Sequence, residues 1–127
     1  MSDISIEEFF GSEFVEHIDV ESRTISRFPG PYSSLAAVLR DALEQASNGK
    51  GRERHASGEH FEQQTICQTI RAHGVGFGTG QAEKKGRESH KLLKMDNGRE
   101  RAVAELLGAI NYLAAAVIVI REGRCGQ

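Results

Sequence analysis

Apolar residues recur every three or four positions along much of this chain, which is the spacing of one face of an α-helix. In "SSLAAVLRDALEQAS" this spacing joins Leu35, Val38 and Leu43, and a serine precedes them as an N-cap. A glycine follows as a C-terminal stop. The pattern predicts a helix over residues 34–47.

Two further helices are expected downstream, separated by glycines. The stretch "HFEQQTICQTIRAHG" places Phe61, Ile66 and Ile70 on one side of a helix that ends at Gly74. The run "GVGFGTGQ" then predicts a glycine-rich break. After this break, Thr79 is predicted to cap a mostly polar helix, "QAEKKGRESHKLLK".

The last helix is predicted over residues 98–122, after the turn "MDNG". Asn97 and Glu100 have the spacing of a capping box at its start. Together with the preceding polar helix it forms a C-terminal helical hairpin. Near the N-terminus, "IDVESRTISRF" alternates weakly in the manner of a strand, and "PGP" follows as a break.

These elements predict a mainly α fold, a small helical bundle with a C-terminal helical hairpin, and allow a short N-terminal β element. The 127 residues suit one domain, 1–127, with an N-terminal segment over 1–31 and a helical region over 32–122.

The last helix is apolar on most of its circumference and needs cover on most of its surface. The helices predicted around it are short or polar, so we expect it to mediate homo-oligomerisation. The alternative is a monomer wrapped by its N-terminal segments. The charge-free part spans fifteen residues, fewer than the roughly 20 of a membrane span, so a membrane partner is not expected. One side comprises Val103, Leu106, Ile110, Leu113 and Val117, and another Leu107, Ala114 and Ile118.

Composition narrows the class of partner and the compartment. A net charge of -2 provides no general basic field for duplex nucleic acid, so anion binding requires a local patch. Cys67 and Cys125 do not form a disulfide framework, and free thiols suit a reducing compartment. The acidic start "MSDISIEEFF" lacks a signal-peptide pattern. These features predict a cytoplasmic protein.

The densest basic stretch, "GKGRERHASGEH", is a candidate anion-binding loop. Lys50 supplies a point charge, Arg52 and Arg54 supply forked donors suited to phosphate, and His55 adds a titratable donor. It is not a Walker loop, because the Gly-Lys pair is followed by glycine rather than serine or threonine. A solvated linker explains the same composition equally well. The histidine and glutamate spacing does not match a zinc motif, so no metal site is predicted.

The glycine-rich break is the second candidate. Backbone N–H groups of Gly76, Gly78 and Thr79 would face the start of a helix, a geometry that accepts anions. Lys84 and Lys85 lie one turn beyond, and Arg87 follows them. The alternative is a tight helix–helix connection followed by a solvated basic face.

The stretch "AELLGAINYLAAAV" resembles the second metal-binding helix of MazG-like nucleotide pyrophosphohydrolases, an all-α family that uses magnesium. Glu105 and Tyr112 fit the family pattern, but Gly108 occupies its aspartate position. The resemblance implies an enzyme that cleaves nucleoside triphosphates, with magnesium as cofactor only in that case. The carboxylates available to such an enzyme are Glu59, Glu62, Glu83, Glu88 and Glu105.

The hairpin sequence "NGRERAVAELLGAINYLAAAVIVI" also resembles the C-terminal hairpin of small phage proteins that sequester nucleotide immune signals. The matching positions are Arg99, Glu100, Val103, Ala104 and the alanines 114–116. This resemblance implies an oligomer that holds a nucleotide between subunits, without a cofactor.

Three functions follow. The favoured one is a small oligomeric helical protein that binds a phosphorylated ligand, in concrete form a phage-type sponge for a nucleotide signal. The alternative is the pyrophosphohydrolase. The third is a phage inhibitor that acts by protein–protein contact through the acidic residues Glu7, Glu8, Glu13, Glu16 and Asp19.

Overall fold

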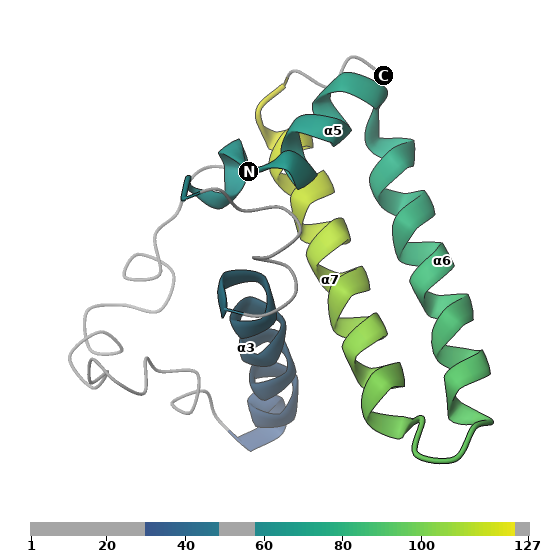
Figure 1. The fold of residues 1–127 in the computed structure, drawn as a ribbon. Coiled ribbons are helices and arrows are strands. Elements are labelled where there is room, and N and C mark those ends of the chain that lie inside the picture. The colour runs from purple at the N-terminus through teal and green to yellow at the C-terminus, as the bar shows by residue number, and fades with distance from the viewer. Residues whose placement is uncertain (1–29, 49–57, 124–127) are drawn as a thin grey trace. The chain divides into compact units, whose positions relative to one another are not determined.

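The computed structural model describes residues 30–48 and 58–123 of the chain. Every regular element in these two ranges is helical, which confirms the mainly α class (Figure 1). The N-terminal β element and the loop that carries Lys50, Arg52, Arg54 and His55 lie outside the described residues. The elements are η2 (Gly30–Tyr32), α3 (Ser33–Asn48), η3 (Phe61–Gln63), α5 (Thr65–His73), α6 (Val75–Leu93) and α7 (Arg99–Arg121).

Helix α3 begins one residue before the predicted start and ends one residue after the predicted end. The Ser33 hydroxyl donates to the Gly30 carbonyl oxygen at 3.1 Å. This bond joins the 3₁₀ turn of η2 to the first turn of α3. A boundary between two compact units of the chain falls at residues 40 and 41, inside this helix.

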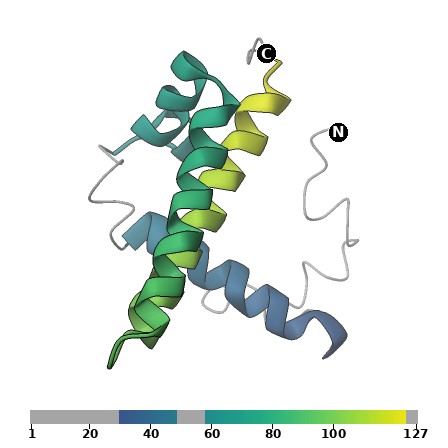
Figure 2. The ribbon, with the colours of Figure 1, turned by 90° about the vertical axis from the view of Figure 1, so that its right-hand side faces the viewer.

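Helices α6 and α7 form the predicted C-terminal hairpin. They run side by side in opposite directions, and the two views agree along their whole length (Figures 1 and 2). The turn between them requires Gly98, because a Cβ there would lie 1.8 Å from the Leu92 carbonyl oxygen. The predicted capping box is wrong. Gly98 is the N-cap of α7 without a side-chain cap, and Asn97 adopts a left-handed φ of 60° in the turn.

The predicted break at the glycine-rich run is also wrong. Helix α6 already begins at Val75, after Gly74 with a φ of 97°, so Gly76, Gly78 and Thr79 are helical. Thr79 is not a cap, and its hydroxyl donates to the Gly76 carbonyl oxygen at 3.4 Å. Tertiary packing outweighs the poor helix propensity of glycine here. A Cβ on Gly78 would lie 2.9 Å from Ile70 Cδ1, so the bare backbone lets α6 approach α5.

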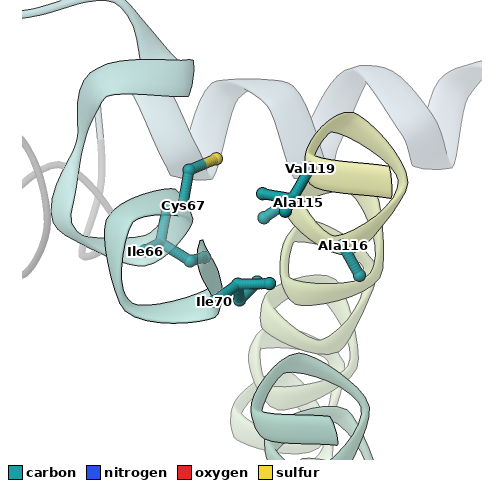
Figure 3. Packing of buried hydrophobic residues seen from close by; sticks show 6 residues of the cluster. All are labelled: Ile66, Cys67, Ile70, Ala115, Ala116 and Val119. Carbon is teal, nitrogen blue, oxygen red and sulfur yellow. The ribbon is translucent and has the colours of Figure 1, made fainter. Parts of the chain in front are cut away.

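The core lies where α5 crosses the end of α7. Figure 3 shows α5 side chains pointing toward small side chains of α7. Phe77 and Tyr112 close the cluster with their rings edge to face at 6.1 Å. Alanine methyl groups on α7 let the two helices approach closely, and the larger α5 side chains fill the space between them. The buried cluster is Ile66, Cys67, Ile70, Ala115, Ala116 and Val119.

Arg71 forms an ion pair that links α5 to the end of α7. Its Nε donates to Glu122 Oε1 at 2.9 Å and its Nη2 donates to Glu122 Oε2 at 2.7 Å, the paired geometry that arginine forms best with a carboxylate. The same Nη2 also donates to the Glu62 carbonyl oxygen. The hydrogen bond to Glu122 raises the pKa of Arg71, so the guanidinium stays charged.

Candidate functional site

The predicted ligand-binding residues that belong to the hairpin lie at different levels along its length and do not converge. Gly76 lies in the first turn of α6, Lys84 near its middle, and Arg99 beyond the hairpin turn. At about 1.5 Å of rise per residue, the first turn of α6 is about 25 Å from the hairpin turn. Lys84 and Arg99 are both exposed. Within one copy of the chain, these residues therefore do not line one pocket.

Lys85 is occupied by contacts within the hairpin. Its ammonium lies 3.3 Å from Glu105 Oε1 and 6.0 Å from the centroid of the Tyr112 ring. Only 14% of its side chain is exposed. The stem crosses Gly108 so closely that a Cβ there would lie 3.1 Å from Lys85 Cδ. Lys85 therefore stabilises the α6–α7 contact, and Gly108 makes room for its stem.

The carboxylates of the pyrophosphohydrolase alternative do not converge in the residues that the structure describes. Glu105 faces Lys85, while Glu83 pairs with Arg87 at 2.9 Å along the same helix face. No group of three or more His, Cys, Asp or Glu side chains within residues 30–48 and 58–123 is arranged to hold a metal ion. The described residues therefore offer no carboxylate cluster for magnesium.

Cys67 is not an activated nucleophile. The side chain is fully buried, and burial raises the pKa of its thiol, an effect that the nearby Arg71 charge only partly offsets. A thiolate is the reactive form of cysteine, so a buried thiol with a raised pKa is inert. Cys67 is a small core residue.

One face of α7 is an apolar surface that the fold leaves uncovered. Its large apolar side chains are 43% to 54% exposed, although the helix is otherwise packed against α5 and α6 and is hydrogen-bonded to the end of α3 through Gln45 and Asn111. The opposite face carries the small buried residues Ala102, Gly108, Ala115 and Ala116, together with Val119. With the half-buried Ile110, the exposed residues form what we call the α7 stripe: Val103, Leu106, Ile110, Leu113, Val117 and Ile120.

Sequence reasoning identified five members of the α7 stripe but missed Ile120. Continuing the alternation of three- and four-residue steps beyond Val117 leads directly to that position. It also treated the helix as apolar all round. The structure distinguishes a covered face of small residues from an uncovered face of large ones. An uncovered, contiguous apolar face is typical of an interaction surface.

Helix α7, with 23 residues, is also the one described helix long and apolar enough to cross a membrane. Its partner in the hairpin argues against that use. Helix α6 lies along α7 and carries Glu83, Lys84, Arg87, Glu88 and Lys91. A charged side chain at the bilayer centre costs at least roughly 2.5–3.5 kcal/mol, so inserting the hairpin would oppose the gain from α7.

No family model matches the chain, and no curated protein or solved structure is similar enough to indicate a relationship. The resemblances to phage nucleotide-binding proteins and to pyrophosphohydrolases therefore stay predictions that rest on short motifs. Besides these resemblances, the described residues provide one physical feature that bears on function, the uncovered α7 stripe.

Proposed function

We propose that this protein is a small self-assembling helical protein that binds a phosphorylated ligand, specifically a nucleotide. The α7 stripe is the observation that supports the assembly, because five of its six large apolar side chains are exposed on a helix whose other face is packed. Covering these side chains with another protein surface removes apolar area from water.

Local basic residues support the choice of a phosphorylated ligand. The net charge is -2, so a phosphate must be recognised by a patch rather than by the whole surface. Lys50, Arg52 and Arg54 supply the donors, with His55 beside them. Exposed Lys84 and Arg99 add positive charge on the hairpin. In concrete form, the protein sequesters a nucleotide signal in the manner of a phage-type sponge.

In this proposal the nucleotide is held and not cleaved. The engagement of Glu105 by Lys85 supports this, as does the lack of a metal-binding group of carboxylates among the described residues. Neither the buried Cys67 nor any gathered set of acids in those ranges offers a nucleophile or a metal-activated water.

Native mass spectrometry of the purified protein tests both parts of the proposal at once. The protein is mixed with nucleoside triphosphates and with cyclic di- and trinucleotides, and bound mass and subunit number are read together. We expect a stoichiometric complex with at least one of these nucleotides, and recovery of that nucleotide intact after the protein is denatured. Catalytic release of a cleaved product would contradict the proposal and favour the pyrophosphohydrolase.

Charge reversal then tests the predicted contacts. The triple variant Lys50→Glu, Arg52→Glu and Arg54→Glu is expected to weaken nucleotide binding by at least about 100-fold, because each charge-assisted hydrogen bond contributes about 1.5–3 kcal/mol. A matched triple on the hairpin, Lys91→Glu, Lys94→Glu and Arg101→Glu, changes net charge equally and is expected to have little effect. Equal losses in both triples would indicate a general charge effect and remove the basic loop as the site.

A further inference from the structure

We propose that α7 pairs with α7 of a second copy of this chain as an antiparallel, two-stranded coiled coil. The partner, its direction and its register all follow from the α7 stripe and the charges that flank it. The pair rests on the self-assembly proposed above and adds these three specifications to it.

The α7 stripe has the spacing of a coiled-coil seam. Its residues are separated by steps of three, four, three, four and three positions, which is the alternation of heptad positions a and d. No polar residue interrupts the six positions. A surface stripe that packs against a globular core is usually wider and less regular. The a positions are Val103, Ile110 and Val117, and the d positions are Leu106, Leu113 and Ile120.

The sequence of steps reads the same from either end of the helix. Two copies of α7 can therefore pair in opposite directions with every stripe residue in a layer. In an antiparallel pair, position a of one helix faces position d of the other. Val103 then meets Ile120 of the partner subunit, Leu106 meets the partner's Val117, and Ile110 meets the partner's Leu113. A two-fold axis passes between the two central layers and repeats every contact, as a closed dimer requires.

Charges beside the seam select the antiparallel direction. Glu100 and Arg121 are both exposed, and both occupy the heptad position e, one at each end of α7. The antiparallel register places Glu100 beside Arg121 of the partner subunit, and symmetry repeats the pair. A parallel register would instead place position e beside position g of the partner, where Arg121 meets an alanine at position 116 and forms no ion pair.

Small residues next to the seam allow the helices to approach closely. Ala109 and Ala114 flank the central part of the α7 stripe, while Ala116 is already buried against α5 and α6. The α7 stripe is exposed while α5, α6 and the end of α3 already contact α7, so pairing does not require the hairpin to open. Each hairpin turn would then lie near the far end of the partner's α7. Arg99 of one subunit is thereby brought to the end of the dimer where the partner's α6 begins.

The mass of the full chain in solution tests the dimer first. Sedimentation equilibrium is expected to give twice the 13.9 kDa of one chain, or an even multiple of it. The double variant Leu106→Glu and Leu113→Glu places carboxylates in the four inner layers and is expected to raise the dissociation constant by at least about 100-fold. The matched control is Leu93→Glu and Met95→Glu, which alters exposed apolar residues outside the α7 stripe and is expected to leave the dimer intact.

Disulfide trapping tests the direction without weakening the seam. In a Cys125→Ser background, with Cys67 buried, the variants Val103→Cys and Ile120→Cys are prepared separately. We expect a disulfide only when the two are mixed. In the antiparallel pair, identical thiols are seventeen residues apart along the helix, about 25 Å, which no disulfide spans. Rapid self-linking of Val103→Cys alone would establish a parallel pair and overturn the proposal.

A charge swap provides a second test of register. Glu100→Arg alone and Arg121→Glu alone are each expected to weaken dimerisation about 3- to 30-fold, whereas the double variant restores it. Failure of the double variant to recover would exclude the proposed ion pair. A monomeric wild-type chain would overturn the coiled coil altogether, while nucleotide binding by that monomer would leave the ligand half of the proposed function standing. A dimer unaffected by Leu106→Glu and Leu113→Glu would retain the assembly but exclude this seam.

Discussion

Replacing Gly80 with alanine is expected to stabilise the protein, whereas the same replacement at Gly78, two residues earlier, is not. Both residues lie inside α6. A Cβ on Gly80 would have no neighbour within 4 Å. A Cβ on Gly78 would lie 2.9 Å from Ile70 Cδ1 and 3.4 Å from the Tyr112 carbonyl oxygen. The two glycines therefore share a backbone conformation but differ in surroundings.

The expected magnitudes follow from this difference. Alanine favours a helix interior by about 0.8–1 kcal/mol relative to glycine, so Gly80→Ala should raise the free energy of unfolding by up to about 1 kcal/mol. For a small domain this raises the melting temperature by about 4–8 °C. Gly78→Ala gains the same propensity, but overpacking costs typically about 1–3 kcal/mol. Ile70 is fully buried and has little room to turn. We expect Gly78→Ala to be at least about 1 kcal/mol less stable than Gly80→Ala.

Urea denaturation followed by the helical circular dichroism signal measures both variants. The protein concentration must be the same in every experiment, because the stability of a self-associating protein depends on concentration. A stabilised Gly78→Ala, or a destabilised Gly80→Ala, would refute the packing explanation. Destabilisation of Gly80→Ala in particular is what a glycine-rich loop with non-helical backbone would give.

Three further predictions concern the hairpin and the core. Lys85→Met should lose at most about 1 kcal/mol of stability in urea denaturation, the value of its ion pair with Glu105, whereas Lys85→Ala should lose about 1 kcal/mol more because its aliphatic stem packs on α7. Burial raises the pKa of Cys67 above its ordinary 9.0, so the stability that this thiol contributes is fully present below pH 9.0 and is lost as the pH rises further. The free energy of unfolding, measured over a pH series, should therefore fall above pH 9.0, and Cys67→Ala should make this fall smaller. Gly98→Ala should lower the free energy of unfolding by about 2 kcal/mol or more, measured by thermal unfolding, because its Cβ would lie 1.8 Å from the Leu92 carbonyl oxygen.

The positions of the helices were largely predictable because apolar residues recur at the spacing of one helix face, whether or not that face is covered. Helix α3 and helix α7 match the predicted ranges within one residue at each end. The glycine-rich start of α6 was not predictable in this way. Local propensity favours a break there, and only the contact of Gly78 with α5 and α7 explains why the backbone is helical.

The ends of the hairpin turn depend on similar tertiary detail. Asn97 and Glu100 have the spacing of a capping box, but Asn97 is used for its tolerance of a left-handed backbone. The Leu92 carbonyl oxygen approaches the backbone so closely at position 98 that only glycine, which has no Cβ, fits there.

The candidate site was predictable only in part. Sequence spacing identified most of the α7 stripe, because a heptad pattern needs no tertiary information. Sequence spacing did not show which basic residues form contacts with other side chains of the same chain. Lys84 and Lys85 are neighbours in the sequence, yet Lys84 is exposed while Lys85 lies against Glu105 and Gly108. Helical rotation separates adjacent residues by about 100° on the surface, so the run of charges alone cannot assign them.

The contact of α5 with the end of α7 has a consequence for synthesis of the protein on the ribosome. Ile70 packs against Val119, and Arg71 pairs with Glu122, 51 residues later in the chain. At about 5–20 residues per second, α5 is translated roughly 3–10 s before its partner. During that interval Ile66, Cys67 and Ile70 lack the α7 surface that buries them. The core can therefore close only after translation of α7 is complete.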